Sequence, residues 1–164
     1  MNNLVLIGMM GCGKSTVGRL LARKLGRELV DTDQYIEEKT GRTIPDLFAK
    51  EGEDFFRELE RAAGETLAAR RDLVIACGGG LPTRSAAIAP LKESGTVLFL
   101  RRDPGEIYDK VSMGGRPLGQ EGRAAFLARY AAREPVYLAW ADIVVDMGAT
   151  PVETAKEILE VLKL

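Results

Sequence analysis

Short, uninterrupted apolar runs are spaced along the chain, and helical periodicity follows them. Five runs are typical of buried strands: residues 4–7, 28–30, 73–76, 96–100 and 143–145. Because the runs are continuous rather than alternating in polarity, they favour a parallel sheet covered on both faces. Strands that alternate with helices predict an α/β fold with right-handed crossovers. We therefore expect a three-layer sandwich around a five-stranded parallel sheet.

Three helical segments are marked by their faces or their ends. The first precedes Gly26, a helix-stop signal, and its apolar face is Val17, Leu20, Leu21 and Leu25. The second has the apolar face Phe56, Leu59, Ala63 and Leu67. The last begins at Thr150-Pro151-Val152-Glu153, a capping box with proline at the first helical position. Ligands of such sheets bind at the carboxyl ends of the strands, so we expect the chemistry just after each strand.

Composition narrows the class of protein. A length of 164 residues predicts one domain, residues 1–164. Lys and Arg total 23 and Asp and Glu total 24, a balance that lacks the basic footprint of a nucleic-acid binder. No apolar run reaches the length of a membrane helix, and the N-terminus lacks the basic region of a secretory signal. We expect a cytoplasmic protein without a nucleic-acid or membrane partner.

The chain contains no histidine. This excludes Ser–His and Cys–His nucleophilic pairs and every histidine-based metal site. The two cysteines, Cys12 and Cys77, are too few for a four-cysteine zinc site, and a disulfide is not expected in the cytoplasm. Proton transfer therefore depends on a carboxylate, Lys, Tyr, Cys or water.

A complete phosphate-binding motif follows the first strand. Residues 8–16 match G-x-x-x-x-G-K-[ST] between a predicted strand and a predicted helix, which is the context that this P-loop motif requires. Lys14 is expected to reach the β- and γ-phosphates of ATP, and the Ser15 hydroxyl to coordinate Mg²⁺. The other expected ATP contacts in the loop are Gly11, Cys12, Gly13 and Thr16. Cys12 lies near the positive end of the helix dipole, where a thiol can be reactive. We interpret it instead as a small residue that fills the loop.

Other nucleotide-binding classes lack their own motifs in this sequence. There is no N-K-x-D base-reading motif of a GTPase and no L-S-G-G-Q signature of an ABC protein. A Walker-B pair of acids after a central strand is also missing. The remaining interpretation is a small kinase that phosphorylates a small molecule.

Three further motifs suit a site for the molecule that accepts the phosphate. Asp31-Thr32-Asp33 follows the second strand, where one acid can serve the metal and the other the acceptor hydroxyl, although Asp is also a good helix N-cap. Arg57 and Glu60 are three residues apart on a helix. They form either a purely structural ion pair or one in which Glu60 orients Arg57 toward a substrate carboxylate. Directly after the third strand, Gly78-Gly79-Gly80 permits a close approach of backbone N–H groups to a ligand.

The order and spacing of these motifs resemble those of the shikimate kinases, in the nucleoside-monophosphate-kinase branch of P-loop folds. Of these motifs only the P-loop is specific when taken alone. The order and spacing of all of them together are specific, and they cover residues 8 to about 137. Besides the P-loop, the matching features are Asp31-Thr32-Asp33, the Phe56-Arg57 segment through Glu60, Gly78-Gly79-Gly80, Arg116-Pro117-Leu118 and Arg133-Glu134-Pro135-Val136-Tyr137.

The resemblance implies transfer of the ATP γ-phosphate to the 3-hydroxyl of shikimate, giving shikimate 3-phosphate in chorismate and aromatic amino acid biosynthesis. It implies that Asp33 holds the reacting hydroxyl, as base or orienter, and that Asp31 helps to place Mg²⁺ beside Ser15, through water. The implied substrate-binding residues are Arg57 and Arg133, which clamp the carboxylate, and Gly78, Gly79 and Gly80, the last two through backbone amides. The family is usually monomeric, so we expect a monomer with a small-molecule partner.

The resemblance also implies two segments within the P-loop kinase domain. Residues 32–60 would bind the substrate, and residues 111–122, rich in glycine, would be a mobile lid over ATP. Arg116 in this lid would be the catalytic arginine that stabilises charge on the transferring phosphoryl group. Its plainer interpretation is a solvated loop charge, which the glycine-rich setting and the following Pro117-Leu118 disfavour.

Two positions depart from the family pattern at the adenine site. The nearest candidate for an adenine-stacking arginine is Lys110, and a second arginine position is Ala149. We therefore expect adenine to rest on Lys110 and Pro151, with weaker stacking because an ammonium lacks the flat guanidinium face.

Two other functions stay open at this point. One is a different P-loop kinase, for gluconate or a nucleotide; the aspartate pair and the three glycines favour shikimate. The other is a catalytically silent nucleotide-binding module. Retention of Lys14, Ser15, Asp33 and Arg116 together argues against it.

Overall fold

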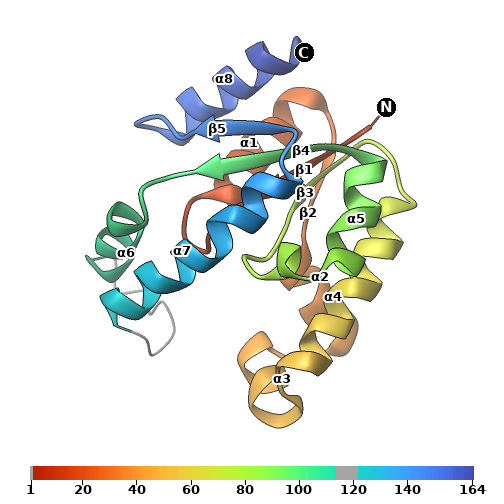
Figure 1. The fold of residues 1–164 in the computed structure, drawn as a ribbon. Helices are drawn as coiled ribbons and strands as arrows, with labels where there is room; N and C mark the ends of the chain where they lie inside the picture. Colours follow the sequence, from red (N-terminus) through yellow and green to blue (C-terminus); the bar gives the residue numbers. More distant parts are fainter. Residues whose placement is uncertain (1, 114–121) are drawn as a thin grey trace.

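The computed structural model describes residues 2–113 and 122–164. Each predicted strand is confirmed to within one residue at either end, and the three predicted helices are present. The elements, labelled in Figure 1, are β1 (Asn3–Ile7), α1 (Lys14–Leu25), β2 (Glu28–Asp31), α2 (Thr32–Thr40), α3 (Ile44–Glu51), α4 (Glu53–Ala68), β3 (Leu73–Ala76), a 3₁₀ turn (Leu81–Thr83), α5 (Ser85–Ser94), β4 (Gly95–Arg101), α6 (Pro104–Met113), α7 (Arg123–Trp140), β5 (Ile143–Asp146) and α8 (Pro151–Leu162).

The five strands form one parallel sheet in the order β2-β3-β1-β4-β5. Strand β1 is central, between β3 and β4. The segments that follow β1, β2 and β3 therefore leave the same edge of the sheet side by side. These segments carry the P-loop, the aspartate pair and the three glycines, so the strand order brings the predicted motifs together.

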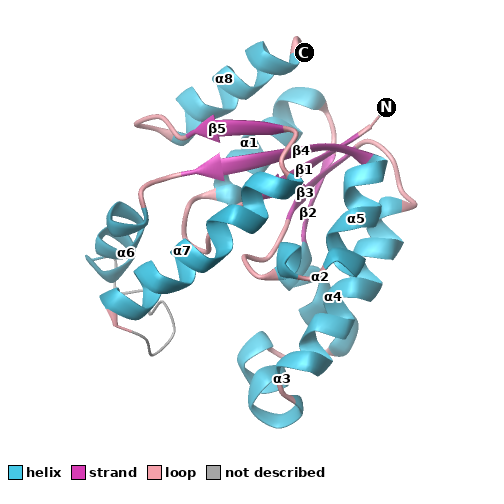
Figure 2. Ribbon diagram, in the orientation of Figure 1, coloured by secondary structure: helices cyan, strands magenta, loops and turns pink. Residues whose placement is uncertain are grey.

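The three inner strands, β3, β1 and β4, are buried on both faces, as the continuous apolar runs predict, whereas the edge strands β2 and β5 are only partly buried, because each has a neighbouring strand on one side alone. In β1, Leu4 and Leu6 belong to a core cluster with side chains of α1 and α8, whereas Val5 and Ile7 belong to a second cluster with side chains of α4 and α5. Helix α7 contributes to both core clusters, because Phe126 belongs to the first and Tyr137 to the second. Figure 2 shows the resulting layers, with α8 and α4/α5 on opposite sides of the strands. No described helix is long and apolar enough to cross a membrane.

Local signals set the ends of the helices. Gly26 ends α1 with a left-handed φ of 66°, and its N–H caps the last turn. The Thr150 hydroxyl accepts a hydrogen bond from the Glu153 N–H at 3.2 Å, so the capping box forms at the start of α8 as predicted. Asp31 caps α2.

Helices α2, α3 and part of α4 form an outlying lobe beyond the sheet. Their own small core is Ile36, Leu47, Phe56 and Ala63. In Figure 1 α3 lies at the tip of this lobe, at the far end of the molecule from α8. The lobe lies beside the carboxyl ends of β2 and β3 and bounds the space there.

Candidate active site

The P-loop wraps back from β1 into α1. Gly11 and Gly13 have left-handed φ values of 80° and 105°, which side-chain-bearing residues rarely adopt. The Lys14 ammonium is buried and donates hydrogen bonds to the carbonyl oxygens of Gly8 and Met9, at 2.8 and 2.9 Å. Since α1 begins at Lys14, its free N–H groups and positive dipole end face the loop. The geometry is that of an anion site.

Ser15 and Asp31 lie together beside the loop. The Ser15 hydroxyl donates a hydrogen bond to Asp31 Oδ2 at 2.7 Å, while Asp31 Oδ1 accepts from the backbone N–H of Asp33 and Gln34. One acid thus does two things, capping α2 and presenting an oxygen next to a hydroxyl. Such oxygen donors fit Mg²⁺, which binds through one or two protein ligands together with phosphate oxygens and water. Among the described residues there is no group of three or more acids or cysteines that could hold a metal ion.

Two larger pockets flank the loop, and a third joins them. The Lys110 pocket, of about 420 Å³, has among its lining residues Gly11, Gly13 and Thr16. The arginine pocket, of about 450 Å³, lies on the lobe side and includes Asp33, Arg57, Arg133 and the three glycines. A bridging pocket of about 250 Å³ shares lining residues with both and also contains Lys14, Ser15 and Asp31. The three pockets therefore form a path from one side of the P-loop to the other.

Asp33 lies in the first turn of α2, where the bridging and arginine pockets meet. Burial and the nearby Asp31 carboxylate raise the pKa of Asp33 above its usual range, while Lys14 opposes the shift. A carboxylate with a raised pKa is a better proton acceptor. Both acids of the predicted pair are thus near the P-loop, with Asp31 toward Ser15 and Asp33 toward the arginines.

The guanidinium of Arg57 is held by two glutamates. Its Nη1 donates to Glu60 Oε1 at 2.5 Å, and its Nη2 lies 3.1 Å from Glu53 Oε2. Arg57 and Glu60 are buried, whereas Glu53 is exposed. The predicted Arg57–Glu60 pair is confirmed, and it fixes the orientation of Arg57 in the arginine pocket. Arg133 reaches the same pocket from α7.

The three glycines leave room for the functional side chains. A Cβ atom on Gly78 would lie 2.5 Å from Asp33 Oδ1, and one on Gly80 would lie 2.4 Å from Arg57 Nη2. At Gly79 the nearest atoms would be the P-loop backbone at 3.1 Å and Arg133 Nη1 at 3.5 Å. The Gly78 N–H donates to the Thr32 hydroxyl at 2.8 Å, and the Gly79 carbonyl accepts from the Tyr137 hydroxyl at 2.6 Å. The turn is therefore fixed, with Asp33, Arg133 and Arg57 packed in order along it.

The Glu60 carboxyl group is buried in the site and is only partly hydrogen-bonded. It is only 1% exposed, and its Oε2 has no hydrogen-bond partner among the described residues. Burial raises the pKa of Glu60 to about 7, although the Arg57 charge opposes this shift. A carboxyl group with this pKa in the folded state stabilises the protein when protonated and loses that contribution as the pH rises toward and past 7.

Glu60→Gln is therefore expected to change the pH dependence of stability. From pH 5.5 to 8 the wild-type chain should lose roughly 2–3 kcal/mol of unfolding free energy relative to the variant, because only the wild type must ionise a buried acid. Thermal melts of both proteins across this range measure the difference. Glu58→Gln, on the exposed part of the same helix, is the control and should show no such divergence. Parallel profiles for wild type and Glu60→Gln would show that the Arg57 ion pair cancels the burial cost.

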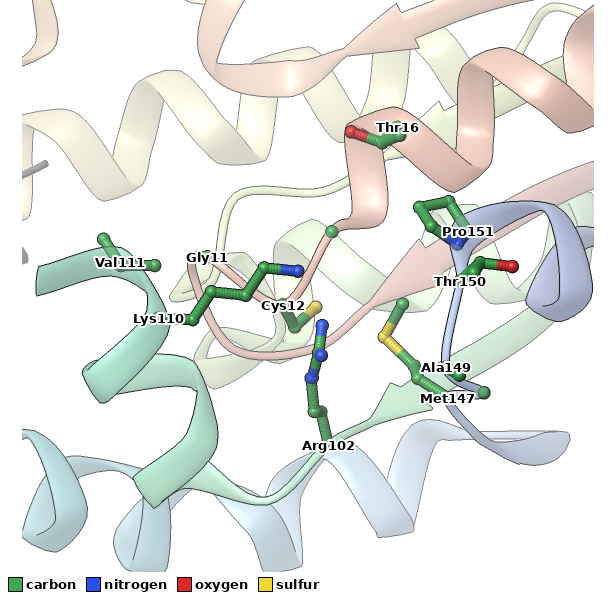
Figure 3. A pocket seen from close by; sticks show the side chains of 12 residues that line it. Gly11, Cys12, Thr16, Arg102, Lys110, Val111, Met147, Ala149, Thr150 and Pro151 are labelled. Carbon is green, nitrogen blue, oxygen red and sulfur yellow. The ribbon is translucent and has the colours of Figure 1, made fainter. Parts of the chain in front are cut away.

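The Lys110 pocket lies between the P-loop, α6 and the turn before α8 (Figure 3). Lys110 and Pro151, the residues expected to contact adenine, both line it, and so do Cys12 and Ala149; that the base binds there stays a prediction. Cys12 is buried and lies 3.9 Å from the Lys14 ammonium. The buried thiol fits the interpretation of Cys12 as a loop-filling residue.

The predicted lid falls largely outside the described part of the chain. Residues 114–121, with Arg116, Pro117 and Leu118, are not described. Residues 111–113 form the last turn of α6, and Gly122 precedes α7. The role of Arg116 as catalytic arginine stays a prediction.

Three charged residues of the two larger pockets went unassigned in the sequence analysis, Glu53, Arg102 and Arg129, and no role was given there to Tyr137. Glu53 is four residues before Arg57, and Arg129 is four before Arg133, so helical spacing carried a signal for both. Arg102 directly follows β4 at the ligand-binding edge. Tyr137 is buried and acts on the glycine turn, which no local pattern reveals.

Comparisons with known proteins agree with one another. The family model described as shikimate kinase matches residues 10–163. The shikimate kinase of Moorella thermoacetica is 45% identical over 98% of this chain and 94% of its own. Among solved structures, the shikimate kinase from Acinetobacter baumannii in complex with shikimate has a TM-score of 0.91 and 37% identity, covering 99% of this chain and 93% of that one. The shikimate kinase from Aquifex aeolicus has a TM-score of 0.83 and 33% identity, covering 98% and 96%.

Proposed function

The chain belongs to the shikimate kinase family, and on this premise we propose where its substrates bind and which residues act on them. Its activity is transfer of the ATP γ-phosphate to the 3-hydroxyl of shikimate, which gives shikimate 3-phosphate in chorismate and aromatic amino acid biosynthesis. ATP occupies the Lys110 pocket and the P-loop, and shikimate occupies the arginine pocket. The observation that carries this assignment is the bridging pocket, which contains Lys14 and Asp33 and shares lining residues with both sites.

Arg57 and Arg133 bind the shikimate carboxylate. Both guanidinium groups line the arginine pocket, and each offers a planar fork that matches a carboxylate. Glu60 keeps Arg57 in a fixed orientation, so less conformational freedom is lost when the acceptor binds. Gly79 and Gly80 present their backbone amides beside these arginines.

Asp33 acts on the hydroxyl group of shikimate, and Lys14 acts on the phosphate groups of ATP. Asp33 orients the 3-hydroxyl and accepts its proton as the oxygen attacks the γ-phosphorus, a role that its raised pKa supports. Lys14 neutralises charge on the β- and γ-phosphate oxygens, which are held by the backbone N–H groups of the loop. Arg116 in the proposed lid places a second positive charge beside the transferring phosphoryl group and stabilises the negative charge there.

Ser15 and Asp31 are the proposed protein contacts of Mg²⁺. Their oxygens already lie within hydrogen-bond distance of each other at the bridging pocket. When bound, Mg²⁺ supplies neutralisation of phosphate charge. Ser15 would hold the ion directly, and Asp31 would hold it through water.

Residues 1–164 act as a single domain, with residues 32–60 as the substrate-binding segment. We propose that the chain works as a monomer in the cytoplasm, without nucleic-acid or membrane partners. A net charge of −1 gives no electrostatic drive toward nucleic acid.

Arg57→Ala tests the acceptor site. The variant is expected to raise the KM for shikimate roughly tenfold to a hundredfold and to leave the KM for ATP nearly unchanged, because it removes a charge-assisted contact to the acceptor alone. ADP release in a coupled assay, with shikimate and with gluconate as acceptors, measures both constants and the acceptor preference. Arg61→Ala, one turn further along α4 and paired with exposed glutamates, is the matched control. An unchanged shikimate KM in Arg57→Ala would disprove the carboxylate clamp.

A further inference from the structure

One side chain of the Lys110 pocket has no role in the proposal above. Arg102 stands in the short connection between β4 and α6 and extends into the pocket. Figure 3 shows its guanidinium between Lys110 on one side and Met147 on the other, below the P-loop at Cys12. Nothing in the sequence motifs accounts for an arginine at this position.

Arg102 is held only weakly by the protein. Its side chain is 23% exposed, and its one ion-pair partner among the described residues is Glu106, with Nε and Oε2 3.9 Å apart. This separation is too long for a hydrogen bond. A guanidinium has five N–H donors, and no described protein group accepts a hydrogen bond from those of Arg102. Its neighbour Arg101 differs sharply, since it makes a two-point contact with Asp146 on β5, at 2.7 and 3.1 Å.

The charge of the pocket also points to a ligand. Among its described lining residues are two cations, Arg102 and Lys110, and no acid. Three apolar side chains, Val111, Met147 and Pro151, also line it. A pocket that combines apolar side chains with a flat cation suits an aromatic ring, because a guanidinium has a planar face that stacks on such rings and an ammonium has none.

We propose that Arg102 stacks on the nucleotide base and supplies the flat cationic surface that Lys110 lacks. Arg102 is thus a base-binding residue, and it favours the larger ring system of a purine over that of a pyrimidine. This inference rests on the proposed placement of the nucleotide in the Lys110 pocket. It assigns the base contact to the β4–α6 connection, in addition to α6 and the turn before α8.

Calorimetric titration of three probes, ADP, CDP and pyrophosphate, tests the proposal. Arg102→Lys keeps the charge and removes the flat surface, whereas Arg102→Leu removes both. Both variants should weaken ADP binding roughly tenfold, weaken CDP binding less, and change pyrophosphate binding by less than about twofold. In turnover assays the KM for ATP should rise while kcat at saturating ATP stays unchanged. Arg101→Lys, the same substitution one residue earlier, should leave all three affinities unchanged.

Other results would overturn the proposal in distinguishable ways. If Arg102→Lys binds ADP like wild type while Arg102→Leu loses ADP and pyrophosphate equally, Arg102 contacts phosphate rather than the base. If neither variant changes ADP affinity but Lys110→Ala does, Arg102 has no binding role and the placement of the nucleotide stands. If Lys110→Ala also has no effect, the placement itself is wrong.

Discussion

Lys14→Ala is expected to lower kcat roughly a thousandfold while the chain remains folded. The Lys14 ammonium is buried in the bridging pocket between the two proposed substrate sites. In this position it stabilises charge that builds up on the transferring group, and interactions made mainly in the transition state appear in kcat. Alanine leaves no other described cation in the lining of that pocket. Steady-state ADP release at saturating ATP and shikimate measures the loss.

The variant also removes two hydrogen bonds that hold the P-loop, from Lys14 to the carbonyl oxygens of Gly8 and Met9. A thermal melt and calorimetric binding of shikimate therefore accompany the assay. Shikimate binding should stay close to wild type, since the arginine pocket does not include Lys14, and the melt verifies that the variant is folded at the assay temperature. Lys24→Ala, at the exposed end of α1, is the control for removal of a lysine. A Lys14→Ala enzyme with near-normal kcat would disprove the role of this lysine in phosphate binding.

Asp33→Asn is the second substitution with a large expected effect, a loss in kcat of roughly a hundredfold to ten-thousandfold. The amide keeps the size of the side chain, so the close packing against Gly78 is retained, but it accepts no proton. Because burial and Asp31 raise the pKa of Asp33, wild-type activity should fall as the pH drops through that raised value. The pH profile of kcat/KM for shikimate should show this acidic limb in the wild type and not in the variant's residual activity.

Asp54→Asn provides the comparison for Asp33→Asn. Asp54 is almost fully exposed, and it is not part of the arginine pocket. Its kinetic constants and pH profile should match those of the wild type. If Asp33→Asn mainly raises the shikimate KM and leaves kcat within a few-fold of normal, Asp33 orients the acceptor and does not act as base.

Much of the fold was predictable because its signals are local. The strand runs are continuous in sequence, and for the three inner strands this continuity correctly predicts burial on both faces. The P-loop, the Gly26 helix stop and the Thr150 capping box each depend on backbone angles and contacts within a few residues. The Arg57–Glu60 pair is a helical i, i+3 contact of the same kind.

Other features of the site have no local signal. The three glycines predict close backbone approach, but only the packed structure shows that Asp33 and Arg57 occupy the space that Cβ atoms on Gly78 and Gly80 would need. The burial of Glu60 and the weak pairing of Arg102 likewise depend on elements far away in the chain. An arginine one residue earlier, Arg101, is used for a cross-strand ion pair instead.

The strands, three of the helices, the phosphate-binding loop and the kind of chemistry open to a chain without histidine could thus be predicted from the amino-acid sequence. Which of the charged residues meet depends on tertiary packing. The order β2-β3-β1-β4-β5 sets three loops side by side, and this order results from the packing of helices on both faces of the sheet. Such packing sums many weak, long-range contacts, and no short stretch of sequence encodes it.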